Sequence, residues 1–285
     1  MGMRTTPHTQ LIQWLTDLHL DKADEARRES LYQEISRSPA DTILITGDIS
    51  SAKHLPLHLR ELAAAAAWRQ VYFVLGNHDY YGSSIAEVEG VVAGVCRSHV
   101  NLRQLGYGEI IRLDGDTALV GHKGWGDGRM GWGARTFARN PDFAAIADFR
   151  GLDRASAFHL LGRLGTESAN YLRSVLPYAL SCYRHVIVAT HVPPFSRAAK
   201  FDQKACDFLR QSFYCNIAAG AFLLRIAKSF PQKRMTVLSG HTHHAAHLQA
   251  TPNLELMVGG AKPGFPRSQG VFKVSATGLI AKEGS

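Results

Sequence analysis

Short apolar runs, each ended by polar residues or glycine, alternate with longer amphipathic stretches in the first third of the chain. Five runs along the chain are rich in β-branched residues and predict buried strands: 10–16, 42–46, 71–75, 185–190 and 235–239. Three amphipathic stretches predict helices: about 22–37, 53–69 and 84–98. Strands and helices in alternation are typical of parallel sheets, so the sequence predicts the α/β class.

The pattern changes in the middle of the chain. Apolar runs at 109–113 and 117–121 flank an Asp-Gly-Asp turn and predict an antiparallel hairpin, so the sheet should be mixed. We expect helices over 155–180 and 203–229, on either side of the 185–190 strand. Four short runs separated by Pro, Asn and Gly predict strands of a second antiparallel layer: about 246–250, 254–259, 270–275 and 278–282.

Residues 124–153 show no strand or helix pattern and form a long segment rich in Gly, Trp and Arg. A loop of this length is usually functional or disordered. Arginine binds phosphate and tryptophan stacks on nucleobases, so the segment is a candidate substrate-binding insertion, and a lid with solvated arginines is the alternative. The candidate contacts are Arg129, Arg135, Arg139, Trp125 and Trp132.

The 285 residues are 45% hydrophobic, which is enough for a substantial core, and no linker or repeat divides them. We therefore expect a single domain over residues 1–285. The formal net charge of +8 favours anionic partners such as phosphate groups or nucleic acid. No signal segment and no apolar run of ~20 residues is seen, so we expect a cytoplasmic protein without a membrane span. The four cysteines form no CxxC pair, which predicts free thiols.

Each of the five predicted strands is followed directly by residues that bind metals. In open α/β sheets the loops at the carboxyl ends of the strands converge on one crevice, so segments far apart in sequence become neighbours there. Carboxylate, imidazole and amide groups together supply the hard and borderline ligands of a two-metal hydrolytic site. The segments are Asp17-Leu18-His19, Gly47-Asp48, Gly76-Asn77-His78-Asp79, His191 and Gly240-His241-Thr242-His243.

These segments resemble the calcineurin-like metallophosphoesterase superfamily, whose pattern is DxH, GD, GNH(D/E), H and GHxH. The resemblance implies an α/β fold of two packed mixed β-sheets flanked by helices, an α/β/β/α sandwich. It also implies that Asp48 bridges two metal ions. The first ion would be held by Asp17, His19, Asp48 and His243, and the second by Asp48, Asn77, His191 and His241.

Two dications a few Å apart lower the pKa of a shared water from ~15.7 toward neutrality, so a bridging hydroxide can attack phosphorus. His78, held by the neighbouring Asp79, is a candidate to protonate the leaving oxygen. We therefore expect a metal-dependent phosphoric ester hydrolase acting on a phosphomonoester or phosphodiester of a small molecule or nucleotide. The ligand set suits Mn²⁺, Fe or Zn²⁺, and Mn²⁺ is the first expectation.

Three other functions compete with this one. Ser/Thr protein phosphatases of the family carry GDxxDRG and GNHE, whereas this chain reads Gly-Asp-Ile-Ser-Ser-Ala-Lys and GNHD, which disfavours that branch. The positive charge favours a nuclease, but basic residues are not clustered with aromatic ones as in single-strand binding grooves. A non-catalytic scaffold of the same fold is disfavoured because the ligand set is intact. The sequence leaves the oligomeric state open.

Overall fold

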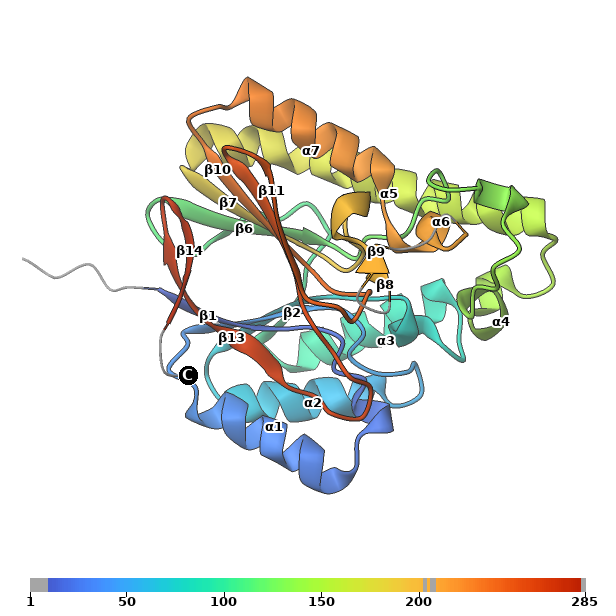
Figure 1. The fold of residues 1–285 in the computed structure, drawn as a ribbon. Helices are drawn as coiled ribbons and strands as arrows, with labels where there is room; N and C mark the ends of the chain where they lie inside the picture. Colours follow the sequence, from blue (N-terminus) through green and yellow to red (C-terminus); the bar gives the residue numbers. More distant parts are fainter. Residues whose placement is uncertain (1–9, 202–203, 206–208, 283–285) are drawn as a thin grey trace, which may run out of the picture.

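The computed structural model describes residues 10–201, 204–205 and 209–282, and in this part of the chain most strands lie in two mixed sheets (Figure 1). The first sheet has the order β14-β13-β1-β2-β3-β4. Strands β1 to β4 run parallel, whereas β13 and β14 are antiparallel to their neighbours. The strands are β1 (Leu11–Leu15), β2 (Thr42–Thr46), β3 (Gln70–Val74), β4 (Leu102–Gln104), β13 (Ser268–Ser275) and β14 (Gly278–Ala281).

The second sheet has the order β11-β12-β10-β7-β6-β5. Its four inner strands are parallel, and the two edge strands β11 and β5 are antiparallel to their neighbours. The strands are β5 (Ile111–Arg112), β6 (Thr117–His122), β7 (His185–Thr190), β10 (Arg234–Ser239), β11 (Ala246–Thr251) and β12 (Leu254–Val258). A separate short pair is formed by β8 (Lys200–Phe201) and β9 (Lys204–Ala205).

Helices cover the outer faces of both sheets, and each set of helices shares an apolar cluster with its sheet (Figure 1). The first sheet is covered by α1 (Glu25–Arg37), α2 (Leu55–Ala66) and α3 (Ile85–Ser98). The second is covered by α5 (Arg154–Cys182) and α7 (Ile217–Ser229). The short helices are α4 (Asp142–Ala145), α6 (Gln211–Tyr214), η1 (Leu20–Lys22), η2 (His78–Tyr80), η3 (Gly133–Arg135), η4 (Ala147–Phe149) and η5 (Ser196–Ala198).

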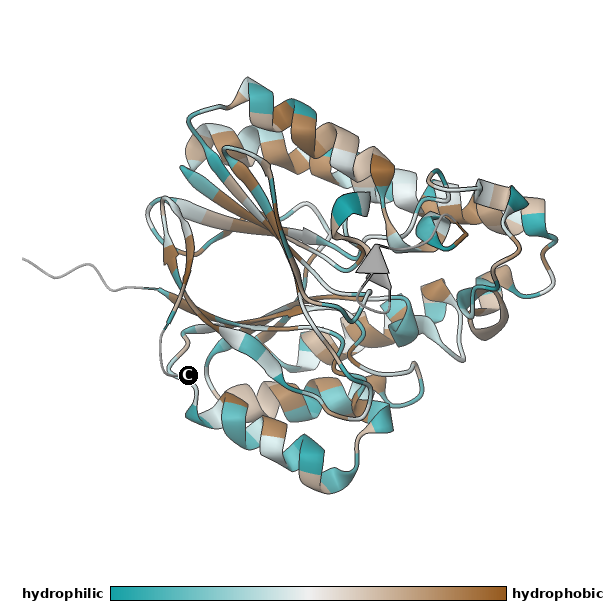
Figure 2. Cartoon of the chain, viewed as in Figure 1, coloured by the Kyte–Doolittle hydropathy of each residue, from teal (hydrophilic) through white to brown (hydrophobic). Residues whose placement is uncertain are grey.

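A third apolar cluster fills the space between the two sheets. Trp14 and Leu44 contribute to it from the first sheet, and Ile187 and Leu238 from the second. The central strands are therefore buried on both faces, which explains why their sequences are nearly continuous apolar runs. Figure 2 shows this distribution, with hydrophobic strands inside and hydrophilic residues on the outer side of α1. The predicted α/β/β/α sandwich is confirmed.

The structure corrects two expectations. The four late strands do not form a layer of their own, because β11 and β12 extend the second sheet whereas β13 and β14 pair with the first. The helix predicted over 203–229 is also wrong in extent. Residues 204–205 are extended, and α7 begins only after Asn216, whose side chain accepts a hydrogen bond from the Ala219 amide at 2.9 Å. Residues 203 and 206–208 lie outside the described residues.

The described residues include no helix that is both long and apolar enough to cross a bilayer.

Candidate metal centre

The five ligand-bearing segments meet at one edge of the sandwich, beyond the carboxyl ends of β1, β2, β3, β7 and β10. A cavity of about 240 Å³ lies there, on the side of the molecule where α4 and α6 are seen in Figure 1. Asp48, Asn77, His78, His241 and His243 are among the residues that line it. The convergence expected from the strand ends is therefore present in the structure.

A first cluster consists of Asp17, His19, Asp48 and His243, and one donor atom of each lies within 4.8 Å of all the others. The His243 Nε2 atom is 3.0 Å from His19 Nε2 and 3.4 Å from Asp17 Oδ1. The His19 Nε2 atom is 3.7 Å from Asp48 Oδ2. Two imidazole nitrogens and two carboxylates that face one point are a donor set for a divalent ion.

A second cluster begins at the other oxygen of Asp48. The distance from Asp48 Oδ1 to His191 Nε2 is 3.2 Å. The Asn77 Oδ1 atom lies 3.2 Å from His191 Nε2 and 3.0 Å from His241 Nδ1. The four residues that the resemblance assigned to a second ion therefore lie together.

Hydrogen bonds around the second cluster set which atoms face its centre. Each imidazole uses one nitrogen to donate to a backbone carbonyl: His191 Nδ1 to Thr46 at 2.8 Å, and His241 Nε2 to Phe213 at 3.1 Å. The Asn77 amide nitrogen donates to Asp142 at 2.8 Å, which turns its oxygen toward the two rings. Such outer bonds are typical of metal sites, where they fix the tautomer and orientation of the ligands. The residues present fit a divalent ion.

Electrostatics also favour positive charge at this place. Burial alone would raise the pKa of Asp48, but the charges of His191 and His78 outweigh burial, and the pKa lies well below its usual value. Burial would lower the pKa of His191, yet Asp48 and then Asp17 raise it to about 10. Burial and the neighbouring His191 lower the pKa of His241 to about 3, so that ring is neutral. A cation between these groups would replace the proton that His191 otherwise holds.

Backbone strain is concentrated at the same residues. Six non-glycine residues of the described chain have a positive φ angle, and five of them belong to the two clusters. This left-handed conformation costs on the order of 1–3 kcal/mol for each non-glycine residue. The five residues, with φ angles of 42° to 71°, are Asp17, His19, Asp48, His241 and His243. Strain of this kind persists where function requires a fixed geometry.

Two motif glycines are required by close packing against the ligands. A Cβ atom at Gly76 would overlap Asp48 Oδ1 and lie 2.7 Å from His191 Nε2. A Cβ atom at Gly240 would overlap a carboxylate oxygen of Asp17. These glycines therefore allow the backbones of neighbouring segments to approach the ligand side chains closely.

His78 lines the cavity, but Asp79 does not contact its ring. The His78 ring stacks on Tyr81 with 4.1 Å between centroids and meets the edge of His19 at 4.6 Å. The buried Asp79 carboxylate instead accepts hydrogen bonds from the backbone amides of Ile49, Ser50 and Gly76, at 2.8, 2.8 and 2.7 Å. Asp79 therefore ties the loop after β2 to the loop after β3, and the expectation that it holds the His78 ring is corrected.

Of the five substrate contacts expected in segment 124–153, the cavity is lined by Arg139. Trp125 is 2% exposed and packs with Tyr80 and Phe149 in the core, so its ring cannot reach a substrate. Arg129 pairs with Asp127 at 3.0 Å and donates to Thr166 of α5, away from the cavity. These two placements correct the sequence-based expectation.

Trp132 and Arg135 are exposed and are not among the residues that line the metal cavity.

The structure also adds residues that the sequence analysis missed. Asp142 of α4 is buried and accepts hydrogen bonds from Asn77 and from the Tyr81 hydroxyl, the latter at 2.6 Å. The ring of Tyr214 in α6 lies beside the His241 ring, with 5.0 Å between the two centroids. The Asn-Pro-Asp sequence at 140–142 signals a turn, but nothing in it indicates that the carboxylate reaches a ligand.

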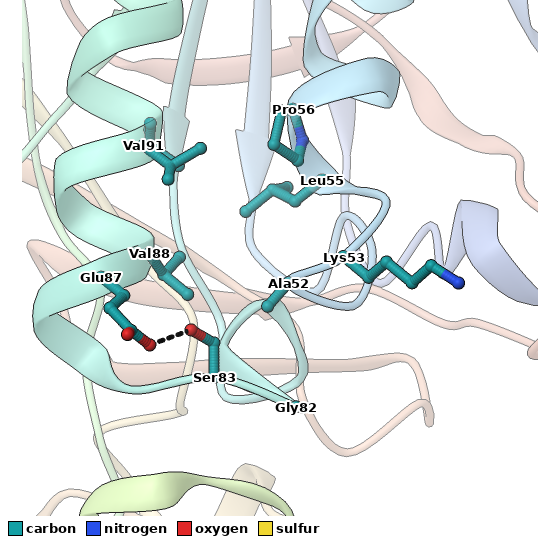
Figure 3. Close-up of a pocket in the computed structure, with 10 residues that line it drawn as sticks. Ala52, Lys53, Leu55, Pro56, Gly82, Ser83, Glu87, Val88 and Val91 are labelled. Atoms are coloured by element: carbon teal, nitrogen blue, oxygen red, sulfur yellow. Dashed lines mark hydrogen bonds between the residues drawn. The ribbon is translucent and has the colours of Figure 1, made fainter.

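A separate cavity of about 250 Å³ lies between the beginnings of α2 and α3 (Figure 3). Its walls are mainly apolar, with Leu55, Pro56 and Val88 among them. The Glu87 carboxylate at its edge accepts from the Ser83 hydroxyl at 2.7 Å and caps α3. None of its lining residues belongs to the metal clusters.

The family model described as calcineurin-like phosphoesterase matches residues 12–245, so the chain belongs to this family. The fold is similar to that of a dimetal phosphatase from Danio rerio, with a TM-score of 0.59 and 12% identity over 94% of this chain and 93% of that one. It is also similar to the protein TT1561 of Thermus thermophilus, with a TM-score of 0.53 and 14% identity over 89% and 90% of the two chains. At such identities the likeness shows the fold alone. No curated protein sequence matches the chain.

Proposed function

We propose that this protein hydrolyses phosphate esters of a small molecule or nucleotide, with two divalent ions bound on either side of Asp48. The observation that carries the proposal is the division of this carboxylate between the clusters. Its Oδ2 faces His19 at 3.7 Å, and its Oδ1 faces His191 at 3.2 Å. A carboxylate placed in this way is the bridging group that a two-metal hydrolytic site requires.

Two divalent ions supply positive charge that activates water and neutralises phosphoryl oxygens. The chain itself contributes His78, which stands at the cavity and is able to donate a proton to the leaving oxygen. The Arg139 guanidinium lines the same cavity and suits a phosphoryl oxygen. Asp79 is a positioning residue, because the three backbone amides that donate to its carboxylate belong to the segments that carry Asp48 and Asn77. Mixed nitrogen and oxygen ligands suit Mn²⁺, Fe or Zn²⁺, and we propose Mn²⁺ first.

Metal analysis of the purified protein tests the proposal, together with a panel of a phosphomonoester, a phosphodiester, an anhydride and single-stranded DNA. We expect about two ions per chain, by analogy with two-metal sites, and turnover of a small substrate. Asp48→Asn removes the bridging charge and should lose both metal and turnover. Glu25→Gln, an exposed carboxylate at the start of α1, is the matched control.

Absence of bound metal together with absence of turnover would favour a non-catalytic scaffold of the same fold and overturn the proposal. Turnover confined to DNA and sensitive to salt would replace it with a nuclease.

A further inference from the structure

A second cavity, of about 550 Å³, adjoins the metal cavity. His243 and His244 line both of them, so the two spaces share a wall. The other polar or aromatic side chains of the second cavity are Lys262, Phe265 and Arg267, all exposed to solvent. We call this space the basic groove, because its described lining contains Lys262 and Arg267 and no aspartate or glutamate.

The loop that carries these residues has a defined geometry. The Phe265 amide donates to the Lys262 carbonyl at 2.9 Å, and Gly264 between them has a φ of 80°. Proline followed by a positive-φ glycine is the signature of a type II turn. This turn brings the Lys262 ammonium to 4.2 Å from the centroid of the Phe265 ring, a cation–π distance.

Contacts on both sides hold the turn in place. The Arg27 guanidinium of α1 donates to the Gly264 carbonyl at 3.2 Å and lies 3.9 Å from the Phe265 ring centroid. On the other side, the Ala261 amide donates to the His243 carbonyl at 3.0 Å. The loop is thereby joined directly to a segment that carries a candidate metal ligand. The turn that carries Lys262 is consequently held next to the metal cavity.

We propose that the basic groove binds a second phosphoryl group of the substrate, so that phosphoric anhydrides such as nucleoside diphosphates are preferred over simple monoesters. This inference rests on the proposed function, since the metal cavity must hold the first phosphoryl group. One bridging oxygen separates the phosphoryl groups of an anhydride, and the groove begins at His243 and His244, where the metal cavity ends. Lysine and arginine supply the charge-assisted hydrogen bonds that the second group accepts.

Calorimetric titration with a non-hydrolysable diphosphate tests the groove without turnover. The probes are the α,β-methylene analogue of adenosine diphosphate and adenosine monophosphate, both in Mn²⁺ buffer. The double variant Lys262→Gln/Arg267→Gln should weaken binding of the diphosphate analogue about 10-fold more than binding of the monophosphate, as expected for two exposed charged contacts. Lys53→Gln/Arg60→Gln on the α2 side removes the same charge elsewhere and should leave the ratio unchanged.

An equal effect on both probes, or no effect, overturns the groove assignment. Loss of the preference in Arg139→Gln instead would place the second phosphoryl group near Arg139 in the metal cavity and overturn it as well. Turnover of a phosphomonoester, a phosphodiester and an anhydride by the wild-type protein is measured in parallel. Absence of turnover on all of them would count against the proposed function, whereas the binding ratio alone decides the groove.

Discussion

The Asp142 carboxylate accepts a 2.8 Å hydrogen bond from the side-chain nitrogen of Asn77. This contact joins segment 124–153 to the second donor cluster. It also decides the orientation of the Asn77 amide, since a carboxylate accepts and leaves the amide oxygen to face His191 and His241. The insertion therefore reaches the metal centre through a buried acid as well as through an arginine at its rim.

Asp142→Asn should weaken binding at the second cluster more than at the first. The substituted amide no longer guarantees that the Asn77 oxygen faces the cavity, and loss of such an outer contact commonly costs 10- to 100-fold in metal affinity. Titration of the metal-free protein with Mn²⁺ should then show one weakened site. The control is Asp148→Asn. Asp148 belongs to the same segment, and its carboxylate accepts a hydrogen bond from the Ile85 amide. Equal affinity in both variants would contradict the positioning role.

The contrast between Asp142 and the ligands shows what the sequence is able to predict. The expected ligands follow apolar runs directly, and the convergence of strand ends then brings them together. Asp142 lies in an irregular segment, where burial depends on contacts with Asn77 and Tyr81 that are more than 60 residues away. Sequence spacing carries no information about such contacts.

The same limit applies to Trp125 and to the late strands. A tryptophan in a glycine-rich segment has the same local pattern whether it packs in the core or faces a ligand, and here it packs on Tyr80. The late runs form strands as expected, but their partners differ from the expected ones. Pairing of β13 with β1 joins residues about 260 positions apart, and no local pattern specifies that pairing.

His78→Ala should keep the metal content and lose most of the turnover. The ring stacks on Tyr81 and belongs to neither donor cluster in the assignment above, so its removal leaves both clusters in place. Loss of a general acid typically lowers kcat by 10²- to 10⁴-fold. Metal analysis and kcat measured side by side check this, with His159→Ala, which removes an exposed imidazole on α5, as the control. Metal loss as large as in Asp48→Asn would show that His78 is a ligand instead.

Gly76→Ala and Gly90→Ala should have opposite effects on stability. A Cβ atom at Gly76 overlaps the Asp48 carboxylate, and overpacking of this kind costs roughly 1–3 kcal/mol. A Cβ atom at Gly90 of α3 meets no neighbour within 4 Å, and alanine in a helix is favoured by roughly 0.5–1 kcal/mol over glycine. Urea unfolding and metal content measured on both variants separate the effects. A Gly76→Ala protein with the stability and metal content of the wild-type protein would refute the close-packing argument.

Arg139→Gln should raise KM for a phosphoester by about 3- to 10-fold, whereas Arg135→Gln should leave KM unchanged. Both arginines are exposed and belong to the same segment, but Arg139 lines the metal cavity and Arg135 does not. A charge-assisted contact near the surface contributes on the order of 1 kcal/mol, which corresponds to this change in KM. Steady-state kinetics of the two variants provide the comparison. Identical KM values would remove Arg139 from the substrate site.

His185 lies at the end of β7 opposite the metal centre, and its protonation should lower the stability of the folded protein in acid. It is fully buried, with Nδ1 2.8 Å from the Ser275 carbonyl and Nε2 2.9 Å from the Thr236 hydroxyl. Burial lowers its pKa from 6.5 to about 4, although the Ser275 carbonyl opposes the shift. Between these values the unfolded chain binds a proton that the folded chain does not. The free energy of unfolding should therefore fall as the pH drops from about 6.5 to 4, by at most about 1.4 kcal/mol per pH unit.

Urea unfolding at several pH values, with a chelator present so that metal release does not contribute, measures this slope. His185→Gln should unfold more easily at neutral pH but should lack the part of the slope below about pH 6.5 that His185 contributes. His159→Gln, which changes an exposed histidine on α5, should keep the slope of the wild-type protein. If His185→Gln and the wild-type protein lose stability equally steeply between about pH 6.5 and 4, His185 is not the group that binds the proton on unfolding.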